Sequence, residues 1–355
     1  MGNIKKERSS NIEMLRLLAM FLVLIVHADF FSLGPSTQND IIASPISAIS
    51  RFFFQSLSII SVNVFVLISG WFGIKPNAKS FCNFIFQCFF FLVGIYIVLL
   101  ICSMTSLSVR GIAGCLVMLK WNWFIKAYIG LYILSPVLNA FITNVEEKTF
   151  RKVLLGFFLF QTIYSWICGG AVFFESGYST MSFIGLYLLA RYVNIYLLNK
   201  TLVYRPFVYL SIFCVITILL TIISSISVRI GLPIISEKMY SYVNPLVIIS
   251  SLSLLLLFNE LNFKNKFINW CAASSFAIFL LHTNPNLCEP YFKPLVLRLY
   301  NAFDGVVCLW YLFLFLLAIG VAAILLDQIR KTIWNCIAKN ILIKFCSNSC
   351  LKYTC

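Results

Sequence analysis

The sequence predicts an all-α protein, a polytopic membrane bundle of about ten transmembrane helices with both termini in the cytoplasm. Its 355 residues are 61% hydrophobic and only 11% charged, with a mean hydropathy of +0.94. Soluble domains carry about 25% charged residues, so this composition excludes a soluble domain. The second observation is a series of apolar runs that approach the roughly 20 residues needed to cross a bilayer. The third is the unequal distribution of lysine and arginine between alternate loops.

Ten apolar runs are candidate spans. They cover residues 14–33, 51–74, 82–104, 122–142, 153–174, 182–198, 207–225, 240–258, 268–284 and 305–327. The first run is long and is followed by no small-residue cleavage motif, so it is not a signal peptide. The sixth is short and contains Arg191. We expect these runs to form one membrane domain over residues 1–327, with no second soluble domain.

The loops between these runs give an independent test of topology. With the N-terminus inside, the inner segments hold 17 lysines and arginines and the outer loops hold seven, although the outer loops are longer. Cytoplasmic loops are typically enriched in these residues, which predicts both termini in the cytoplasm and a multi-pass protein of the cytoplasmic (inner) membrane. The net charge of +15 is thereby explained by topology, and we predict no nucleic-acid partner.

Residues 328–355 form a basic tail. Its apolar residues recur at four-residue intervals from Ile329 to Phe345, with lysines between them. This spacing is typical of an amphipathic helix that lies on the anionic inner leaflet, and a solvated tail is the alternative. The 13 cysteines are scattered, mostly within apolar runs, and suggest neither an essential disulfide nor a metal site.

Three ionisable residues share one face of the first predicted helix. Arg16 and His27 are eleven positions apart, which at about 100° per residue places them on nearly the same face, roughly 16 Å apart along the axis. Glu13 lies one turn before Arg16, where an ion pair can form. Charges in a bilayer are costly unless they are paired or serve a ligand, so this face is a candidate site. Asp29 points elsewhere and is assigned to the outer entrance.

Each of these residues also has a structural explanation. His27 could form a hydrogen bond to a neighbouring helix and do no chemistry. Arg16 could extend its guanidinium to the inner interface as a topology determinant. The alignment of both residues on one face favours the site.

The stretch "EMLRLLAMFLVLIVH" resembles the start of the acyltransferase-3 family of polytopic membrane acyltransferases. Those proteins begin with an acidic residue, then an arginine, ten intervening residues and a histidine, matched here by Glu13, Arg16 and His27. "SVNVFVLISGWFGI" resembles the family's second helix, with its Ser69–Gly70 pair, and "SSFAIFLLHTNP" resembles its late helix ending at His282. "WNWFIKAYIGLYILSPVLN" is similar to its aromatic fourth helix.

The resemblance implies an enzyme that moves an acyl group, often acetyl, from cytoplasmic acyl-CoA to a cell-surface polysaccharide or a lipid-linked glycan. Acetyl-CoA or another acyl-CoA would be a donor substrate, with no permanently bound cofactor. Many relatives carry an arginine pair after the Ser-Gly helix, where this chain has "KPNAKSF". Lys75 and Lys79 are therefore the candidate phosphate-binding residues beside Arg16, although lysine lacks the bidentate fork of arginine.

His27 is the candidate base for the acceptor hydroxyl, because imidazole titrates near neutrality. A covalent acyl-histidine at the same residue is the open alternative. Arg16 is assigned to a coenzyme phosphate or to the thioester carbonyl, with Glu13 orienting it.

Three further residues are candidates for the substrate pathway. His282 either faces the same cavity as His27 or marks the outer interface. Ser69 lines the pathway or, as small residues do in membranes, permits close packing beside Gly70. Lys126 lines the pathway or extends to the interface. The long loop at residues 284–304 is a candidate acceptor surface, with a plain connector as the alternative.

Two other functions remain as alternatives. A transporter or flippase for a small anion or lipid-linked intermediate would also place charges inside spans, although no matching broken half-helices are visible. An inactive family member or assembly partner would explain lysines in place of arginines.

Overall fold

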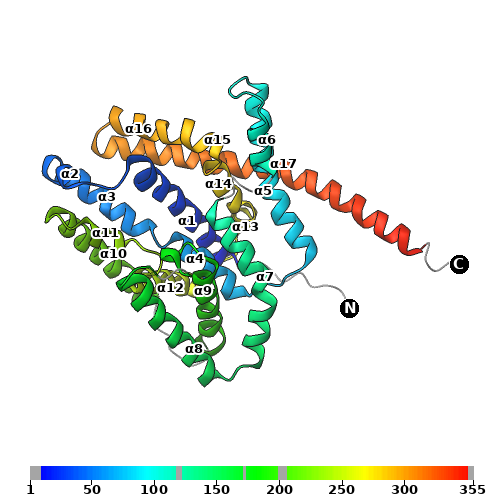
Figure 1. The fold of residues 1–355 in the computed structure, drawn as a ribbon, viewed down its shortest axis with the longest axis horizontal. Coiled ribbons are helices and arrows are strands. Elements are labelled where there is room, and N and C mark those ends of the chain that lie inside the picture. The colour runs from blue at the N-terminus through cyan, green and yellow to red at the C-terminus, as the bar shows by residue number, and fades with distance from the viewer. Residues whose placement is uncertain (1–8, 117–121, 171–172, 199–205, 351–355) are drawn as a thin grey trace.

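The computed structural model describes residues 9–116, 122–170, 173–198 and 206–350, and in this part of the chain every regular element is a helix (Figure 1). The α-helices are α1 (Ser10–Val26), α2 (Gln38–Ala43), α3 (Pro45–Ser58), α4 (Ser61–Phe72), α5 (Ala78–Ile101), α6 (Val109–Leu116), α7 (Trp123–Asn144), α8 (Glu147–Phe160), α9 (Thr180–Tyr192), α10 (Pro206–Arg229), α11 (Pro233–Met239), α12 (Pro245–Glu260), α13 (Lys266–Ala272), α14 (Ser275–His282), α15 (Pro285–Leu287), α16 (Lys293–Ala302) and α17 (Gly305–Cys350). The same described ranges contain four π-helices, η1 (His27–Leu33), η2 (Gln161–Ile167), η4 (Val193–Leu197) and η6 (Cys288–Phe292), and the 3-10 helix η3 (Glu175–Gly177).

The prediction of an all-α membrane bundle is confirmed. Six segments in the described residues are long and apolar enough to cross a membrane: Ser10–Leu33, Pro45–Phe72, Ala78–Ile101, Trp123–Asn144, Pro206–Arg229 and Gly305–Ala338. The shorter apolar helix Pro245–Glu260 coincides with the predicted span at 240–258. The predicted spans at 153–174, 182–198 and 268–284 fall on helices that contain a π-helical segment or a break. The count of ten spans and the orientation of the termini stay predictions.

Local cap chemistry determines where several long helices begin. The side chains of Asn77, Asn122 and Asn244 each accept a hydrogen bond from a backbone N–H in the first turn of α5, α7 and α12. These N–H groups have no partner within the helix, so a short polar side chain at the cap satisfies them where the helix starts.

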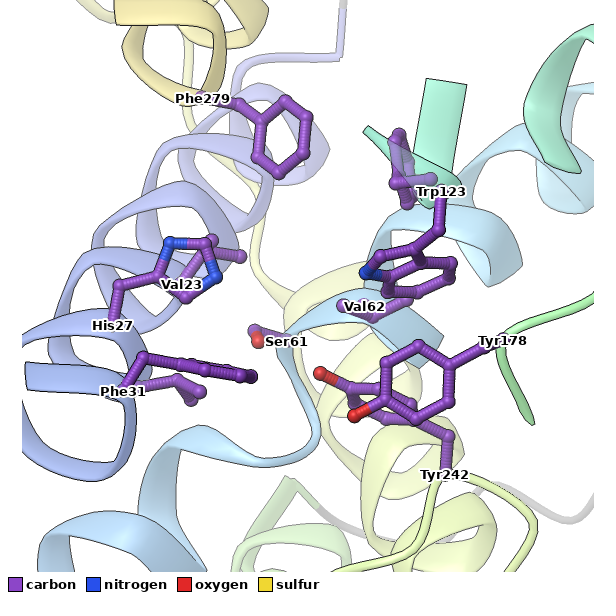
Figure 2. Close-up of a pocket in the computed structure, with 11 residues that line it drawn as sticks. Val23, His27, Phe31, Ser61, Val62, Trp123, Tyr178, Tyr242 and Phe279 are labelled. Atoms are coloured by element: carbon purple, nitrogen blue, oxygen red, sulfur yellow. The ribbon is translucent and has the colours of Figure 1, made fainter. Parts of the chain in front are cut away.

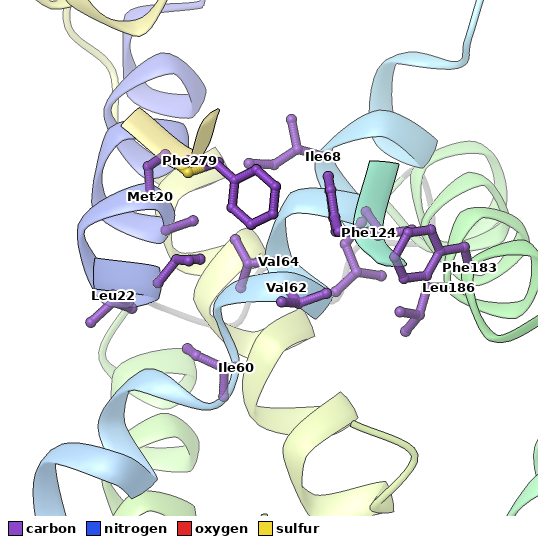
Figure 3. Packing of buried hydrophobic residues seen from close by; sticks show 14 of the residues in the cluster. Met20, Leu22, Ile60, Val62, Val64, Ile68, Phe124, Phe183, Leu186 and Phe279 are labelled. Atoms are coloured by element: carbon purple, nitrogen blue, oxygen red, sulfur yellow. The ribbon is translucent and has the colours of Figure 1, made fainter. Parts of the chain in front are cut away.

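α1 lies in the interior of the bundle and packs against α3, α4, α12, α13, α14 and α17. Leu15, Ala19 and Leu24 on α1 are completely buried. Figure 3 shows the core in which side chains of α1, α4, α7, α9 and α14 meet around Val62 and Phe279. The helix that carries the predicted site is therefore surrounded by protein on most sides.

α17 continues without a break through residues 327 and 328, the predicted boundary between membrane domain and tail, and its C-terminal part extends away from the bundle (Figure 1).

A buried ion pair holds α17 beside α5. The carboxylate of Asp327 accepts hydrogen bonds from Arg330 Nε at 2.8 Å and Gln87 Nε2 at 3.0 Å, and Arg330 Nη1 donates to Asn83 Oδ1 at 2.6 Å. This hydrogen-bonded network offsets the desolvation of both charges.

Candidate active site

His27 lies at the point where α1 changes from α-helical to π-helical geometry. It caps α1 and is the first residue of η1, and Ser32 Oγ donates a hydrogen bond to the His27 carbonyl at 2.7 Å. π-Helical segments are rare and occur often at functional sites, because the wider turn changes the direction in which a side chain projects.

His27 and His282 are joined directly. His27 Nδ1 lies 2.8 Å from His282 Nε2, and His282 Nδ1 lies 2.6 Å from the carbonyl oxygen of Ile278. A carbonyl only accepts, so in the neutral pair His282 carries its proton on Nδ1 and its Nε2 must accept from His27. This network assigns the His27 proton to Nδ1 and leaves Nε2 of His27 with a free lone pair.

A cavity adjoins the imidazole of His27 (Figure 2). Its walls are mostly valine and aromatic side chains, with one serine: Val23, Val26, His27, Phe31, Ser61, Val62, Trp123, Phe124, Tyr178, Tyr242 and Phe279. Figure 2 shows Nε2 of His27 on the cavity side of the ring, opposite Trp123 and the two tyrosine hydroxyls. The cavity has a volume of about 20 Å³, enough for one or two waters. Larger occupants require side chains to move.

A second group of polar residues lies near the N-terminal end of α1. Arg16 Nη1 donates to Glu13 Oε2 at 2.7 Å, and the Glu13 side chain is only 8% exposed. Ser69 Oγ lies 3.3 Å from the hydroxyl of Tyr128, which is within electrostatic range of Arg16. The structure thus pairs Glu13 with Arg16 and brings Ser69 to Tyr128.

Aromatic rings fill the space between these two groups. Tyr128 stacks on Phe124 with ring centroids 6.0 Å apart, Phe124 meets Phe279 at 5.4 Å, and Phe279 meets His282 at 6.0 Å. Arg16 and His27 thus share a helix face, as predicted, but occupy opposite ends of an aromatic column.

The acyltransferase-3 family model, described as an acyltransferase domain, matches residues 9–327, which is nearly the whole chain. The chain belongs to the acyltransferase-3 family. The protein is therefore a multi-pass membrane acyltransferase. No curated protein and no solved structure gives a significant match.

The remaining predicted residues of this acyltransferase lie in different places. Lys75 and Lys79 are exposed, on the loop between α4 and α5 and in the first turn of α5. Lys126 is also exposed and does not line the cavity. Ser69 donates to the carbonyl of Phe65 at 3.2 Å, and its neighbour Gly70 packs closely against α9.

Asp29 lies in η1, two residues after His27, and its place at the outer entrance stays a prediction. Its Oδ1 accepts from Arg51 Nε at 2.7 Å, both side chains are little exposed, and Arg51 also donates to the carbonyl of Gly34. The Arg51 guanidinium lies 5.9 Å from the centre of the Tyr300 ring, which belongs to the predicted acceptor segment 284–304. The ion pair between Arg51 and Asp29 joins α3 to η1, the helix that begins with His27.

Sequence reasoning missed the aromatic residues of the cavity and left the place of His282 open. Trp123, Tyr178 and Tyr242 come from three separate segments, and only the packing of α7, α9 and α12 brings them opposite His27. A signal was present for Trp123, which lies in the aromatic stretch that resembles the family's fourth helix. None was present for the tyrosines.

Proposed function

We propose that this acyltransferase moves an acetyl group from cytoplasmic acetyl-CoA to a hydroxyl of a cell-surface polysaccharide or lipid-linked glycan, in the inner membrane. The observation that carries the proposal is the lone pair on Nε2 of His27, which the hydrogen bond to His282 directs at the cavity. An unprotonated imidazole nitrogen in a small, largely apolar space suits a proton acceptor or a nucleophile.

The reaction follows from this geometry. The acceptor oxygen bonds to the thioester carbonyl carbon while its proton passes to Nε2 of His27. The C–S bond then breaks, and the imidazolium returns the proton to the leaving sulfur. In the covalent alternative Nε2 itself attacks the carbonyl and coenzyme A leaves as the thiolate. The acceptor hydroxyl then cleaves the acyl-imidazolium, and its proton passes to the thiolate. His282 positions His27 in both routes, because it fixes which nitrogen carries the proton.

The lining of the cavity supports a glycan acceptor. The C–H faces of sugar rings pack well on aromatic rings, and Trp123, Tyr178 and Tyr242 supply three such rings opposite His27. Burial raises the pKa of Tyr178, so its hydroxyl stays protonated and can donate to a sugar oxygen.

The position of Arg16 supports an extended donor. The phosphates of coenzyme A are separated from its thioester by the long pantetheine arm. A phosphate near Arg16 at the predicted inner end of α1 is therefore compatible with a thioester near His27 once the aromatic side chains between them move. This separation favours a coenzyme phosphate over the carbonyl as the partner of Arg16, whose guanidinium Glu13 orients.

The test uses inverted membrane vesicles supplied with acetyl-CoA labelled in the acetyl group. Wild type, His27→Ala and the control Met104→Ala, an exposed position in the turn after α5, are compared at equal membrane levels. We expect label in glycan for wild type and control only. Normal labelling by His27→Ala would refute the role of His27. Hydroxylamine-labile label on wild-type protein denatured rapidly at neutral pH, absent from His27→Ala, would favour the covalent route. Glycan export without coenzyme consumption would favour a transporter.

A further inference from the structure

Arg191 lies against the loop that joins α4 to α5. It is in the last turn of α9, and three atoms of its guanidinium group would lie 3.5–3.8 Å from a Cβ atom built on Gly73. This approach is possible because α4 and α9 pack very closely one turn earlier, where a Cβ on Gly70 would lie 2.6 Å from the backbone oxygen of Tyr187. The guanidinium therefore covers the backbone at the start of the loop.

The guanidinium of Arg191 lacks the partner that comparable arginines have. Arg16, Arg51 and Arg330 each form an ion pair with a carboxylate. Within the described ranges Arg191 forms no ion pair, and its buried Nε has no hydrogen-bond partner. A buried donor without a partner is costly, which indicates a group that is satisfied by a ligand.

The loop beneath Arg191 is held in a fixed shape. The Tyr187 hydroxyl accepts from the backbone N–H of Ile74 at 3.1 Å and donates to Asn139 Oδ1 at 2.6 Å, and Asn139 Nδ2 donates to the Ile74 carbonyl at 2.8 Å. Farther along, the backbone N–H of Asn77 donates to the Tyr132 hydroxyl at 3.0 Å. A fixed loop can present its charged side chains without a large loss of conformational entropy on binding.

The charge and shape around this loop suit a phosphate. Lys75 and Lys79 are exposed on the loop and at the start of α5, and no acidic residue lies between Gly73 and Phe81. An open groove of about 390 Å³ borders the same segment, lined by Pro76, Asn77, Ala78, Phe81, Tyr132, Ile133 and Pro136. The first turn of α5 adds its positive dipole end.

We infer that Arg191, together with Lys75 and Lys79, binds a phosphate group of the acyl-CoA donor, and this inference rests on the proposed function. The loop itself carries only lysines, which act as point charges, whereas the planar guanidinium can donate two parallel hydrogen bonds to phosphate oxygens. α9 thus supplies the arginine fork that the "KPNAKSF" segment lacks. The alternative is an arginine retained only for membrane topology.

Equilibrium binding to the purified full-length protein in nanodiscs distinguishes these roles, with coenzyme A and inorganic pyrophosphate as probes. Arg191→Gln is compared with Arg191→Lys and with Arg151→Gln, which removes an exposed arginine from α8. We expect Arg191→Gln to weaken coenzyme A binding by about tenfold or more, Arg191→Lys to retain an intermediate affinity, and Arg151→Gln to match wild type.

Each result resolves the inference. Equal coenzyme A affinity for Arg191→Gln and wild type overturns it and leaves the proposed function intact. Equal loss in Arg191→Gln and Arg191→Lys, with a lowered thermal midpoint in both, assigns Arg191 a structural role and also overturns it. Pyrophosphate binding that depends on Arg191, without coenzyme A binding, keeps the phosphate site and refutes the acyl-CoA donor. Binding of neither probe by wild type overturns both proposals.

Discussion

Replacing His282 tests whether the two histidines act as a unit. His282→Leu removes the acceptor 2.8 Å from His27 Nδ1 and places an apolar side chain in that position. The Nδ1–H of His27 is then left without its partner, a loss of about 1–3 kcal/mol for a buried donor. The imidazole escapes this cost by turning or by changing tautomer, and either change removes the lone pair from the cavity.

The expected effect is on the chemical step. A penalty of about 1–3 kcal/mol corresponds to a fall in kcat of roughly 5- to 150-fold. KM for acetyl-CoA should change little, because the proposed donor contacts lie at the Arg16 end of the aromatic column. His282→Gln should recover part of the rate, since its side-chain oxygen can accept from His27 Nδ1.

Initial rates of label transfer in vesicles give kcat and KM at matched protein levels, and thermal midpoints in detergent show whether each variant is folded. The reasoning is refuted if a folded His282→Leu enzyme has the wild-type kcat. It is equally refuted if the leucine and glutamine variants are impaired alike, since the hydrogen bond would then be irrelevant.

Two further predictions concern stability, measured as the thermal midpoint of the purified protein. Arg51→Gln leaves the Asp29 carboxylate without its ion-pair partner and should lower the free energy of unfolding by about 3 kcal/mol. The double variant with Asp29→Asn should regain part of this loss, and no recovery would show that the pair is not the cause. Gly70→Ala should cost about 1–3 kcal/mol, because its new methyl group would lie 2.6 Å from the Tyr187 backbone oxygen and separate α4 from α9. Gly94→Ala on α5 is the control, since no atom lies within 4 Å of the methyl group there, and an equal loss in both variants would contradict the packing argument.

Composition and helical spacing were sufficient to predict the class of the protein and the three ionisable residues on one face of α1. Hydropathy and composition report the free energy of transfer into lipid, which needs no tertiary information, so the all-α membrane bundle was predictable. The helical repeat is equally local, so Glu13, Arg16 and His27 could be placed on one face before the fold was known. The family resemblance carried by these residues was confirmed over residues 9–327.

The partners of these residues depend on how the helices pack. His27 and His282 are 255 positions apart, and no periodicity relates them, so their hydrogen bond depends on the packing of α14 beside α1. The same holds for Arg191, whose guanidinium covers the loop after α4 because two glycines there leave room for α9. Contacts between distant segments follow from the shapes of whole packed helices. Those shapes depend on many residues along each helix at once, whereas a sequence motif gives only the spacing of residues that are close together in the chain.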